Sequence, residues 1–208
     1  NTAIAGIERL EGQDNNGGPL LAASQFGLFG TVAALGGGTS ASFRLSKGGT
    51  GTIAFDKVLT SATIYASAEA ETLSLKAGTK TALTYYGGTS TGAGTVTGGD
   101  GADWLEGGDG ADVMEGGAGF DSYNADANDT IRDADGRGSV FLDDQRLTGG
   151  TRKESDPENE YRNGNTVYVL NGTTLVIDGG LTINDFKKGD LGIFLETEPD
   201  DEDEPDMD

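Results

Sequence analysis

The chain has 208 residues, of which 36 are glycine and only 35% are hydrophobic, a composition typical of turn-rich β-structure rather than of helices. Its 35 acidic and 14 basic residues give a net charge of −21, which disfavours binding to nucleic acid and to anionic membranes and favours binding of cations. The absence of cysteine and histidine excludes disulfides, thiolate and imidazole metal sites, and catalysis that needs an imidazole base.

The residue pattern of the first 97 residues predicts a connecting segment followed by short strands. Residues 1–42 mix a polar Gly-rich stretch with a modestly apolar run and are interpreted as a connector or cap. They lack the charged and apolar regions of a signal peptide, so we expect the chain to begin inside a larger protein. Residues 43–97 contain short segments rich in Ile, Val, Thr and Tyr, such as GTIAF and ETLSL, which predict strands of a β-solenoid or a small sandwich.

A nine-residue repeat follows in three consecutive copies. The copies read GGDGADWLE (98–106), GGDGADVME (107–115) and GGAGFDSYN (116–124), which gives the pattern GGxGxDxUx with Leu105, Met114 and Tyr123 at the apolar position U. The preceding TSTGAGTVT has Gly94 where Asp belongs, and the following NADANDTIR keeps Asp129 with one residue deleted. Further upstream, ASAEAETLS places Glu71 in the Asp position. The solenoid is therefore expected to extend beyond the three copies.

The residue types in the repeat suit a hard cation. Glycines at the first, second and fourth positions allow a tight turn whose carbonyls point inward, and Ca²⁺ prefers six to eight oxygen ligands. The short xUx segment can form a parallel ladder when equivalent segments stack, with U in the centre. Two repeats then complete one coil, so that turns eighteen residues apart lie above one another and can hold an ion between them.

These residues resemble the RTX, or hemolysin-type calcium-binding, repeat family of secreted bacterial proteins. The resemblance implies an all-β fold, a right-handed parallel β-roll or β-solenoid with short calcium-binding turns and β-rich capping regions, with Ca²⁺ as the cofactor. It also implies ligands from two stacked turns for each ion. One predicted site comprises Gly99, Gly101, Asp103, Gly116, Ala118 and Asp121, and a second comprises Gly108, Gly110 and Asp112 with Asn124, Asp126 and Asp129. A half-formed site pairs Gly107, Asp109 and Asp112 with Ser90 and Gly92.

The downstream part predicts a cap and a tail. Residues 98–135 hold the repeats, and within them Asp133 and Asp135 fit either a further ligand pair or an ordinary turn. Residues 136–196 contain apolar runs around NG and DG turns and predict a β-rich C-terminal cap. The stretch LTINDFKKGDLGIFL is similar to the region after the repeats in type I secreted proteins, including neisserial iron-regulated RTX proteins. Residues 197–208 predict a disordered acidic tail.

The resemblance implies a calcium-binding module that folds after export through the type I secretion machinery of a Gram-negative bacterium, extracellularly or at the cell surface. We expect no catalytic activity in this fragment, because almost every carboxylate is explained by the repeat, a turn or the tail. We expect no nucleic-acid partner because of the negative charge, and no membrane insertion because no apolar stretch is long enough to span a membrane. Two alternatives stay open. One is a structural or adhesive module of a surface layer or adhesin, and the other is the non-catalytic C-terminal region of a secreted hydrolase or toxin with an upstream catalytic domain.

Overall fold

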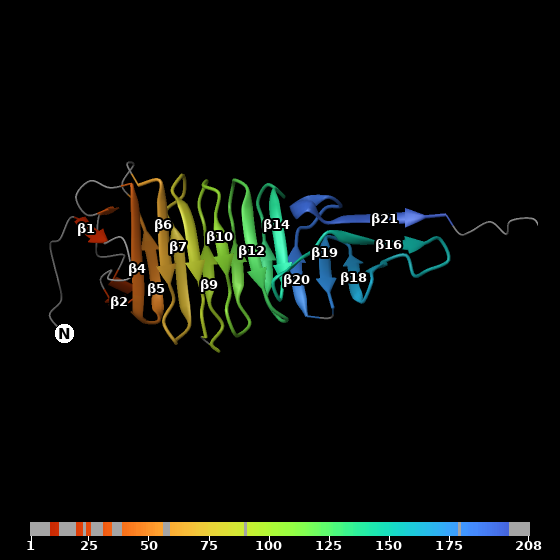
Figure 1. Ribbon diagram of the computed structural model, residues 1–208, viewed down its shortest axis with the longest axis horizontal. Helices are drawn as coiled ribbons and strands as arrows, with labels where there is room; N and C mark the ends of the chain where they lie inside the picture. The colour runs from red at the N-terminus through yellow and green to blue at the C-terminus, as the bar shows by residue number, and fades with distance from the viewer. Residues whose placement is uncertain are drawn as a thin grey trace, which may run out of the picture.

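The protein is an elongated stack of β-coils with a narrower β-sheet cap at one end (Figure 1). This computed structural model describes residues 9–12, 20–22, 24–25, 31–34, 39–55, 59–89, 91–178 and 180–199. No α-helix occurs within these residues, and hence none that could span a membrane. Most of the predicted connector (1–42) and most of the predicted acidic tail lie outside the described residues.

Within the described residues, the strands form three sheets. An eight-stranded sheet has the order β15-β14-β12-β10-β8-β6-β4-β2, an eleven-stranded sheet has the order β21-β16-β17-β18-β19-β20-β13-β11-β9-β7-β5, and β1 pairs with β3. The strands are β1 (Arg9–Gly12), β2 (Leu20–Ala22), β3 (Thr31–Ala34), β4 (Ser40–Lys47), β5 (Gly49–Ile53), β6 (Ser61–Tyr65), β7 (Glu71–Leu75), β8 (Ala82–Tyr86), β9 (Thr95–Thr97), β10 (Trp104–Glu106), β11 (Val113–Glu115), β12 (Asp121–Ala125), β13 (Thr130–Arg132), β14 (Gly138–Leu142), β15 (Gln145–Arg146), β16 (Gly149–Lys153), β17 (Glu160–Asn163), β18 (Thr166–Asn171), β19 (Thr174–Ile177), β20 (Leu181–Asn184) and β21 (Phe194–Glu198). A 3₁₀ turn, η3 (Asp190–Gly192), lies beside β14.

From β4 to β14 the chain alternates between the two large sheets, so one strand from each sheet makes one coil, and neighbouring coils pair in parallel. In the repeat, Trp104 pairs with Ser122 and Thr95 with Val113, a step of eighteen residues. The expected parallel β-solenoid is therefore confirmed. Upstream coils are longer, because Ser40 pairs with Ser61, twenty-one residues later.

The core is a pair of facing ladders, one from each sheet. The apolar positions of the repeat, Leu105, Met114 and Tyr123, are completely buried, as the pattern predicted. Burial of an aliphatic side chain of this size contributes about 1.5–3 kcal/mol. One ladder consists of Phe43, Ile64, Tyr85, Leu105, Tyr123 and Val140, and the other contains Leu73, Val96, Met114, Ile131 and Ile183.

The cap continues the eleven-stranded sheet. Strands β16 to β20 form an antiparallel meander, and β20 joins the coils by pairing in parallel with β13. The turns before β18 and β19 contain Gly164 and Gly172, whose positive φ angles of 60° and 64° suit the tight Asn-Gly connections seen in the sequence. The last strand, β21, pairs in parallel with β16 at the end of the sheet.

Candidate metal centre

The repeat turns stack along the two edges of the roll. On the first edge, turns 98–103, 116–121 and 133–138 lead into the eight-stranded sheet, and on the second edge, turns 87–94, 107–112 and 125–129 lead into the eleven-stranded sheet. Backbone hydrogen bonds join each turn to the one below. The N–H of Ala118 donates to the carbonyl of Gly99 (2.9 Å), and the N–H of Asp109 donates to that of Gly88 (3.2 Å). Ligands from two stacked turns are thus brought within reach of each other.

The four repeat aspartates are buried and hold neighbouring coils together. Asp103, Asp112, Asp121 and Asp129 are 0–6% exposed. Through Oδ1, Asp121 accepts the N–H of Asp103 (2.9 Å), and Asp129 accepts that of Asp112 (2.8 Å). Asp103 and Asp112 accept the N–H groups of Leu83 and Gly94 in the same way. Because a hydrogen bond to a charged group contributes about 1.5–3 kcal/mol, each aspartate also holds its coil to the one before.

The second carboxylate oxygens divide the aspartates into two kinds. Oδ2 of Asp103 accepts the N–H of Gly99 (2.9 Å), and Oδ2 of Asp129 accepts that of Asp126 (3.0 Å). Oδ2 of Asp112 and of Asp121 is buried and has no hydrogen-bond partner. A buried ionised oxygen without a partner is strongly destabilising, and a cation is the partner that its charge requires.

Burial has a matching electrostatic effect on these carboxyls. Desolvation raises the pKa of Asp121 to about 7, and the nearby charges of Asp103, Asp133 and Asp135 add to it. Desolvation likewise raises the pKa of Asp112 and of Asp129 to about 6. Without a cation, the fold therefore makes ionisation of these carboxyls less favourable than it is in the unfolded chain, although calcium would need them ionised.

Ligands of the first predicted site face one another across the first edge. The point where a β-carbon on Gly98 would lie is 2.1 Å from Oδ2 of Asp103 and 2.4 Å from the carbonyl oxygen of Gly116 in the next turn. The carbonyls of Gly99 and Gly101 point toward the same turn, because a β-carbon on Gly117 or Gly119 would lie 2.2 or 2.1 Å from them. Only glycine leaves this space open, which explains the residue type at the first and second positions.

The second predicted site has an equivalent arrangement on the second edge. A β-carbon on Gly107 would lie 2.8 Å from Oδ2 of Asp129 and 3.2 Å from Oδ2 of Asp112, so these two oxygens converge beside Gly107. Oδ1 of Asn124 and Oδ1 of Asp126 are also buried without a hydrogen-bond partner.

The half-formed site is described only in part. Gly92 lies under Gly110, where a β-carbon would be 3.2 Å from the Gly92 carbonyl, and Ser90 lies outside the described residues. Gly94 supplies no side chain to this turn, but its N–H donates to Oδ1 of Asp112 (2.6 Å).

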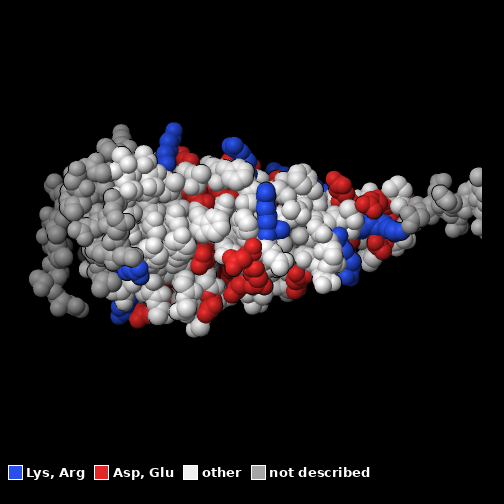
Figure 2. All heavy atoms as spheres, in the orientation of Figure 1, with Lys and Arg blue, Asp and Glu red and all other residues white. Residues whose placement is uncertain are grey.

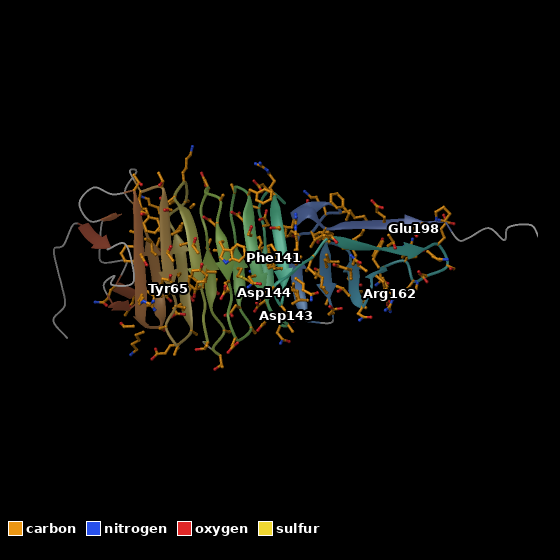
Figure 3. The ribbon with its side chains drawn as sticks, in the orientation of Figure 1. Tyr65, Phe141, Asp143, Asp144, Arg162 and Glu198 are labelled. Atoms are coloured by element: carbon orange, nitrogen blue, oxygen red, sulfur yellow. The ribbon has the colours of Figure 1, made fainter. Side chains whose placement is uncertain are left out.

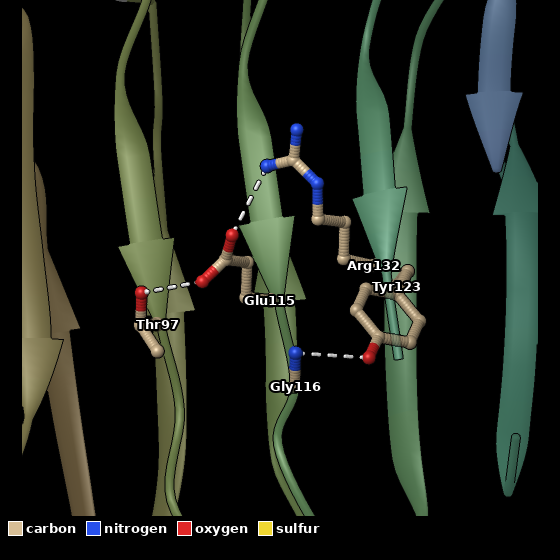
Figure 4. A network of polar contacts seen from close by, with 5 residues as sticks. All are labelled: Thr97, Glu115, Gly116, Tyr123 and Arg132. Atoms are coloured by element: carbon tan, nitrogen blue, oxygen red, sulfur yellow. Dashed lines mark hydrogen bonds and ion pairs between the residues drawn. The ribbon is translucent and has the colours of Figure 1, made fainter. Parts of the chain in front are cut away.

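Asp133 and Asp135 use their oxygens to build the last turn. Oδ1 of Asp133 accepts the N–H groups of Asp135 and Gly136, and its Oδ2 accepts the hydroxyl of Tyr123 (2.6 Å). Asp135 accepts the N–H groups of Gly119 and Arg137. The Tyr123 hydroxyl also accepts the N–H of Gly116, the first residue of the turn that leads into β12 (Figure 4). These bonds agree with the interpretation of the pair as an ordinary turn.

Two acidic residues beside the second site were not identified from the sequence. Asp143 and Asp144 form the turn between β14 and β15, with positive φ angles of 48° and 62°, and lie together at one edge of the roll (Figure 3). Asp144 accepts the side-chain N–H of Asn124 (3.0 Å). They line a hollow of about 280 Å³ together with Gly88, Glu106, Gly108, Asp109, Asn124, Ala125 and Asp126.

Acidic side chains gather over the middle of the molecule (Figure 2). Even so, no group of three or more acidic side chains within the described residues converges closely enough to hold a metal by itself. A cation here would need main-chain carbonyls as well, as the glycine-rich turns allow. That requirement suits a hard oxygen-seeking ion such as Ca²⁺.

The comparison with protein families agrees with this geometry. A family model described as the RTX calcium-binding nonapeptide repeat, in four copies, matches residues 88–123. The match begins upstream of the three regular copies and includes the coil in which Gly94 replaces Asp. No curated protein and no solved structure matches the chain, so the similarity of LTINDFKKGDLGIFL to neisserial proteins has no support from these comparisons. The chain carries RTX repeats folded as a β-roll, which imply a calcium-binding module.

Proposed function

We propose that the chain is a calcium-responsive folding module of a larger protein exported by type I secretion from a Gram-negative bacterium. The observation that supports it most strongly is the pair of buried, partnerless Oδ2 atoms on Asp112 and Asp121, within stacked RTX turns. In a cytosol with scarce free Ca²⁺ these carboxylates repel one another and oppose folding of the repeat coils. Outside the cell, calcium supplies the missing positive charge.

In this proposal each ion lies between two stacked turns and takes ligands from both. On the first edge the ligands are Gly99, Gly101, Asp103, Gly116, Ala118 and Asp121. On the second edge they are Gly108, Gly110, Asp112, Asn124, Asp126 and Asp129, with Gly107, Asp109 and Asp112 contributing to the half-formed site. Bound calcium neutralises and coordinates the carboxylates.

Several sites together would give a sharp response. Extracellular modules bind Ca²⁺ at about 10⁻⁴–10⁻³ M. A site whose free calcium is ten times its Kd stabilises the folded state by about 1.4 kcal/mol. We propose that the first- and second-edge sites act together, because Asp103, Asp112, Asp121 and Asp129 link successive coils by hydrogen bonds.

A far-ultraviolet circular dichroism titration tests the proposal, with Ca²⁺ raised from chelator to about 10 mM, which covers the affinity range of such modules, and with Mg²⁺ as control. The proposal expects a cooperative gain of β-structure with Ca²⁺ alone. The double variant Asp103→Ala, Asp121→Ala should lose the first-edge site, and Asp100→Asn, at an exposed position, is its control. A wild-type spectrum that is the same in chelator and in calcium would contradict the proposal.

A structural or adhesive role is the second candidate, favoured by aromatic side chains on the outer face of the eight-stranded sheet. Tyr65 and Tyr86 stack with ring centroids 5.2 Å apart, and the Arg44 guanidinium lies 4.6 Å from the Tyr65 ring centre. Binding to a surface glycan array that is lost in Tyr65→Ala and Tyr86→Ala, without loss of calcium response, would support this role. In either role the repeat region is non-catalytic, and any enzymatic activity would reside in an upstream domain.

A further inference from the structure

The coils before the repeat close their turns in a different chemical way. On the first edge, Thr60 and Thr81 lead into β6 and β8. The register between β8 and β10 places Leu83 opposite Asp103, so the Asp position is apolar in this upstream coil. Thr81 is 4% exposed and its hydroxyl donates to the carbonyl of Leu59 (2.8 Å), and the hydroxyl of Thr60 donates to that of Thr39 (3.0 Å). A neutral hydroxyl thus links each of these coils to the one before it, and it needs no cation.

The second edge shows the same difference. Glu71 aligns with Gly94 and Asp112 in the stack, and it is 3% exposed. Its Oε1 accepts both the N–H of Ser67 (2.7 Å) and the hydroxyl of Ser67 (2.6 Å). The acidic position upstream is therefore satisfied by donors from its own turn, whereas Oδ2 of Asp112 has none.

The coils before the repeat and the repeat coils differ in their net charge and in whether their buried polar atoms have hydrogen-bond partners. In the described residues of 39–87, no buried side-chain nitrogen or oxygen lacks a hydrogen-bond partner, whereas residues 98–135 contain four such atoms, on Asp112, Asp121, Asn124 and Asp126. Residues 39–87 carry five basic and three acidic side chains, a net charge of +2. Residues 98–135 carry one basic and eleven acidic side chains, a net charge of −10. Self-repulsion and unsatisfied carboxylates are confined to the repeat coils.

We propose that the solenoid consists of two parts: coils β4 to β8, which fold without a cation, and coils β10 to β13, which are completed by calcium and add onto the preformed edge of the first part. This inference rests on the proposed calcium response of the repeat and restricts it to residues 98–129. The Leu83 N–H on the preformed edge donates to Asp103 (2.7 Å), which gives the first calcium-dependent coil a defined point of attachment.

Hydrogen–deuterium exchange of the full chain, read by mass spectrometry in chelator and in Ca²⁺, tests the inference. Peptides covering β6 to β8 should exchange at least about tenfold more slowly than in denaturant under both conditions. Peptides covering β10 to β12 should exchange at the denatured rate in chelator and become protected in calcium. Exchange at the denatured rate in β6 to β8 in chelator would overturn the inference while leaving the proposed calcium response intact.

The opposite failure is equally recognisable. If β6 to β8 and β10 to β12 are all protected in chelator, the two-part division is wrong, and so is the proposed calcium-coupled folding. The three patterns of exchange therefore separate the failure of this inference from the failure of the proposed function.

Two variants test whether the hydroxyl hydrogen bonds stabilise the turns of the coils before the repeat. Thr81→Val removes the buried hydroxyl but keeps the side-chain shape, and it should lower protection of β6 to β8 in chelator several-fold. Its matched control is Thr84→Val, a half-buried position on the same strand. Ser67→Ala removes one donor to Glu71 and should have the same effect on β7. Unchanged protection in both Thr81→Val and Ser67→Ala would show that these hydroxyls do not close the turns, and would overturn the inference.

Discussion

Replacing Asp121 by asparagine should separate the calcium-binding role of this side chain from its structural role. Asparagine keeps an Oδ1 acceptor for the Asp103 N–H but places a neutral amide where the partnerless Oδ2 lies. Burial raises the pKa of Asp121 from an ordinary value of 3.8 to about 7. At a pH above that value, keeping this carboxylate ionised in the calcium-free fold costs about 4 kcal/mol.

Two opposite effects follow from this cost. In chelator at pH 8, Asp121→Asn removes the cost, so the repeat coils should be more folded than in the wild type, by up to about 4 kcal/mol. In calcium the variant lacks a charged ligand, so the midpoint of the calcium titration should rise by at least about tenfold, the range seen when a metal site loses supporting groups. More structure in chelator together with a weaker response to calcium is the expected signature.

Far-ultraviolet circular dichroism at pH 8 measures both effects, with Asp100→Asn as a control that makes the same charge change at an exposed position of the neighbouring turn. The control Asp100→Asn should keep the calcium midpoint of the wild type. The reasoning is refuted if Asp121→Asn keeps it as well. It is also refuted if Asp121→Asn is less folded than the wild type in chelator, because the ionised carboxylate would then stabilise the calcium-free fold.

Three further predictions concern pH, the glycine turn and the core. Because Asp112, Asp121 and Asp129 have pKa values of about 6 to 7 in the calcium-free fold, above those of the unfolded chain, protonation stabilises that fold. The β-signal in chelator should therefore be greater at pH 5 than at pH 8, and equal signals would contradict this sign. Gly107→Ala places a methyl group 2.8 Å from Oδ2 of Asp129 and should weaken calcium binding measured by calorimetry. Its control is Gly78→Ala, where the new methyl group has no atom within 4 Å but the backbone has a φ of +81°. This control should lose only about 1–2 kcal/mol of stability and keep its calcium affinity. Met114→Ala should lower the calcium-saturated stability by about 2–5 kcal/mol in urea unfolding, and a loss no greater than in Val113→Ala would contradict the assignment of Met114 to the core.

The nine-residue period contained enough information to predict the coil. Eighteen residues per coil, the inward direction of Leu105, Met114 and Tyr123, and the parallel stacking all follow from a turn of fixed length next to a three-residue strand. A repeat of constant length leaves a single register in which all apolar positions face the centre, because a shift by one residue would turn each of them outward.

Features that depend on loops of unequal length could not be predicted from the nine-residue period. Asp144 reaches Asn124 through a turn that follows the irregular last coil, so no periodic spacing relates Asp143 and Asp144 to the second-edge site. The upstream coils are longer, with a step of twenty-one residues from Ser40 to Ser61, and Leu83 lies opposite Asp103, so the motif is absent although the stacking continues. Which carboxylate oxygens lack a partner depends on distances of a few tenths of an ångström, which no residue pattern encodes.

The most direct test of the account is a crystal structure of the calcium-bound chain in which the ions are located by their anomalous scattering. The account predicts ions between stacked turns, on the first edge beside Gly98 within the reach of Asp103 and Asp121, and on the second edge beside Gly107 within the reach of Asp112 and Asp129. The account would be contradicted if crystals grown in saturating calcium showed no ion at either position. It would also be contradicted if they showed ions only beside exposed carboxylates on the outer surface.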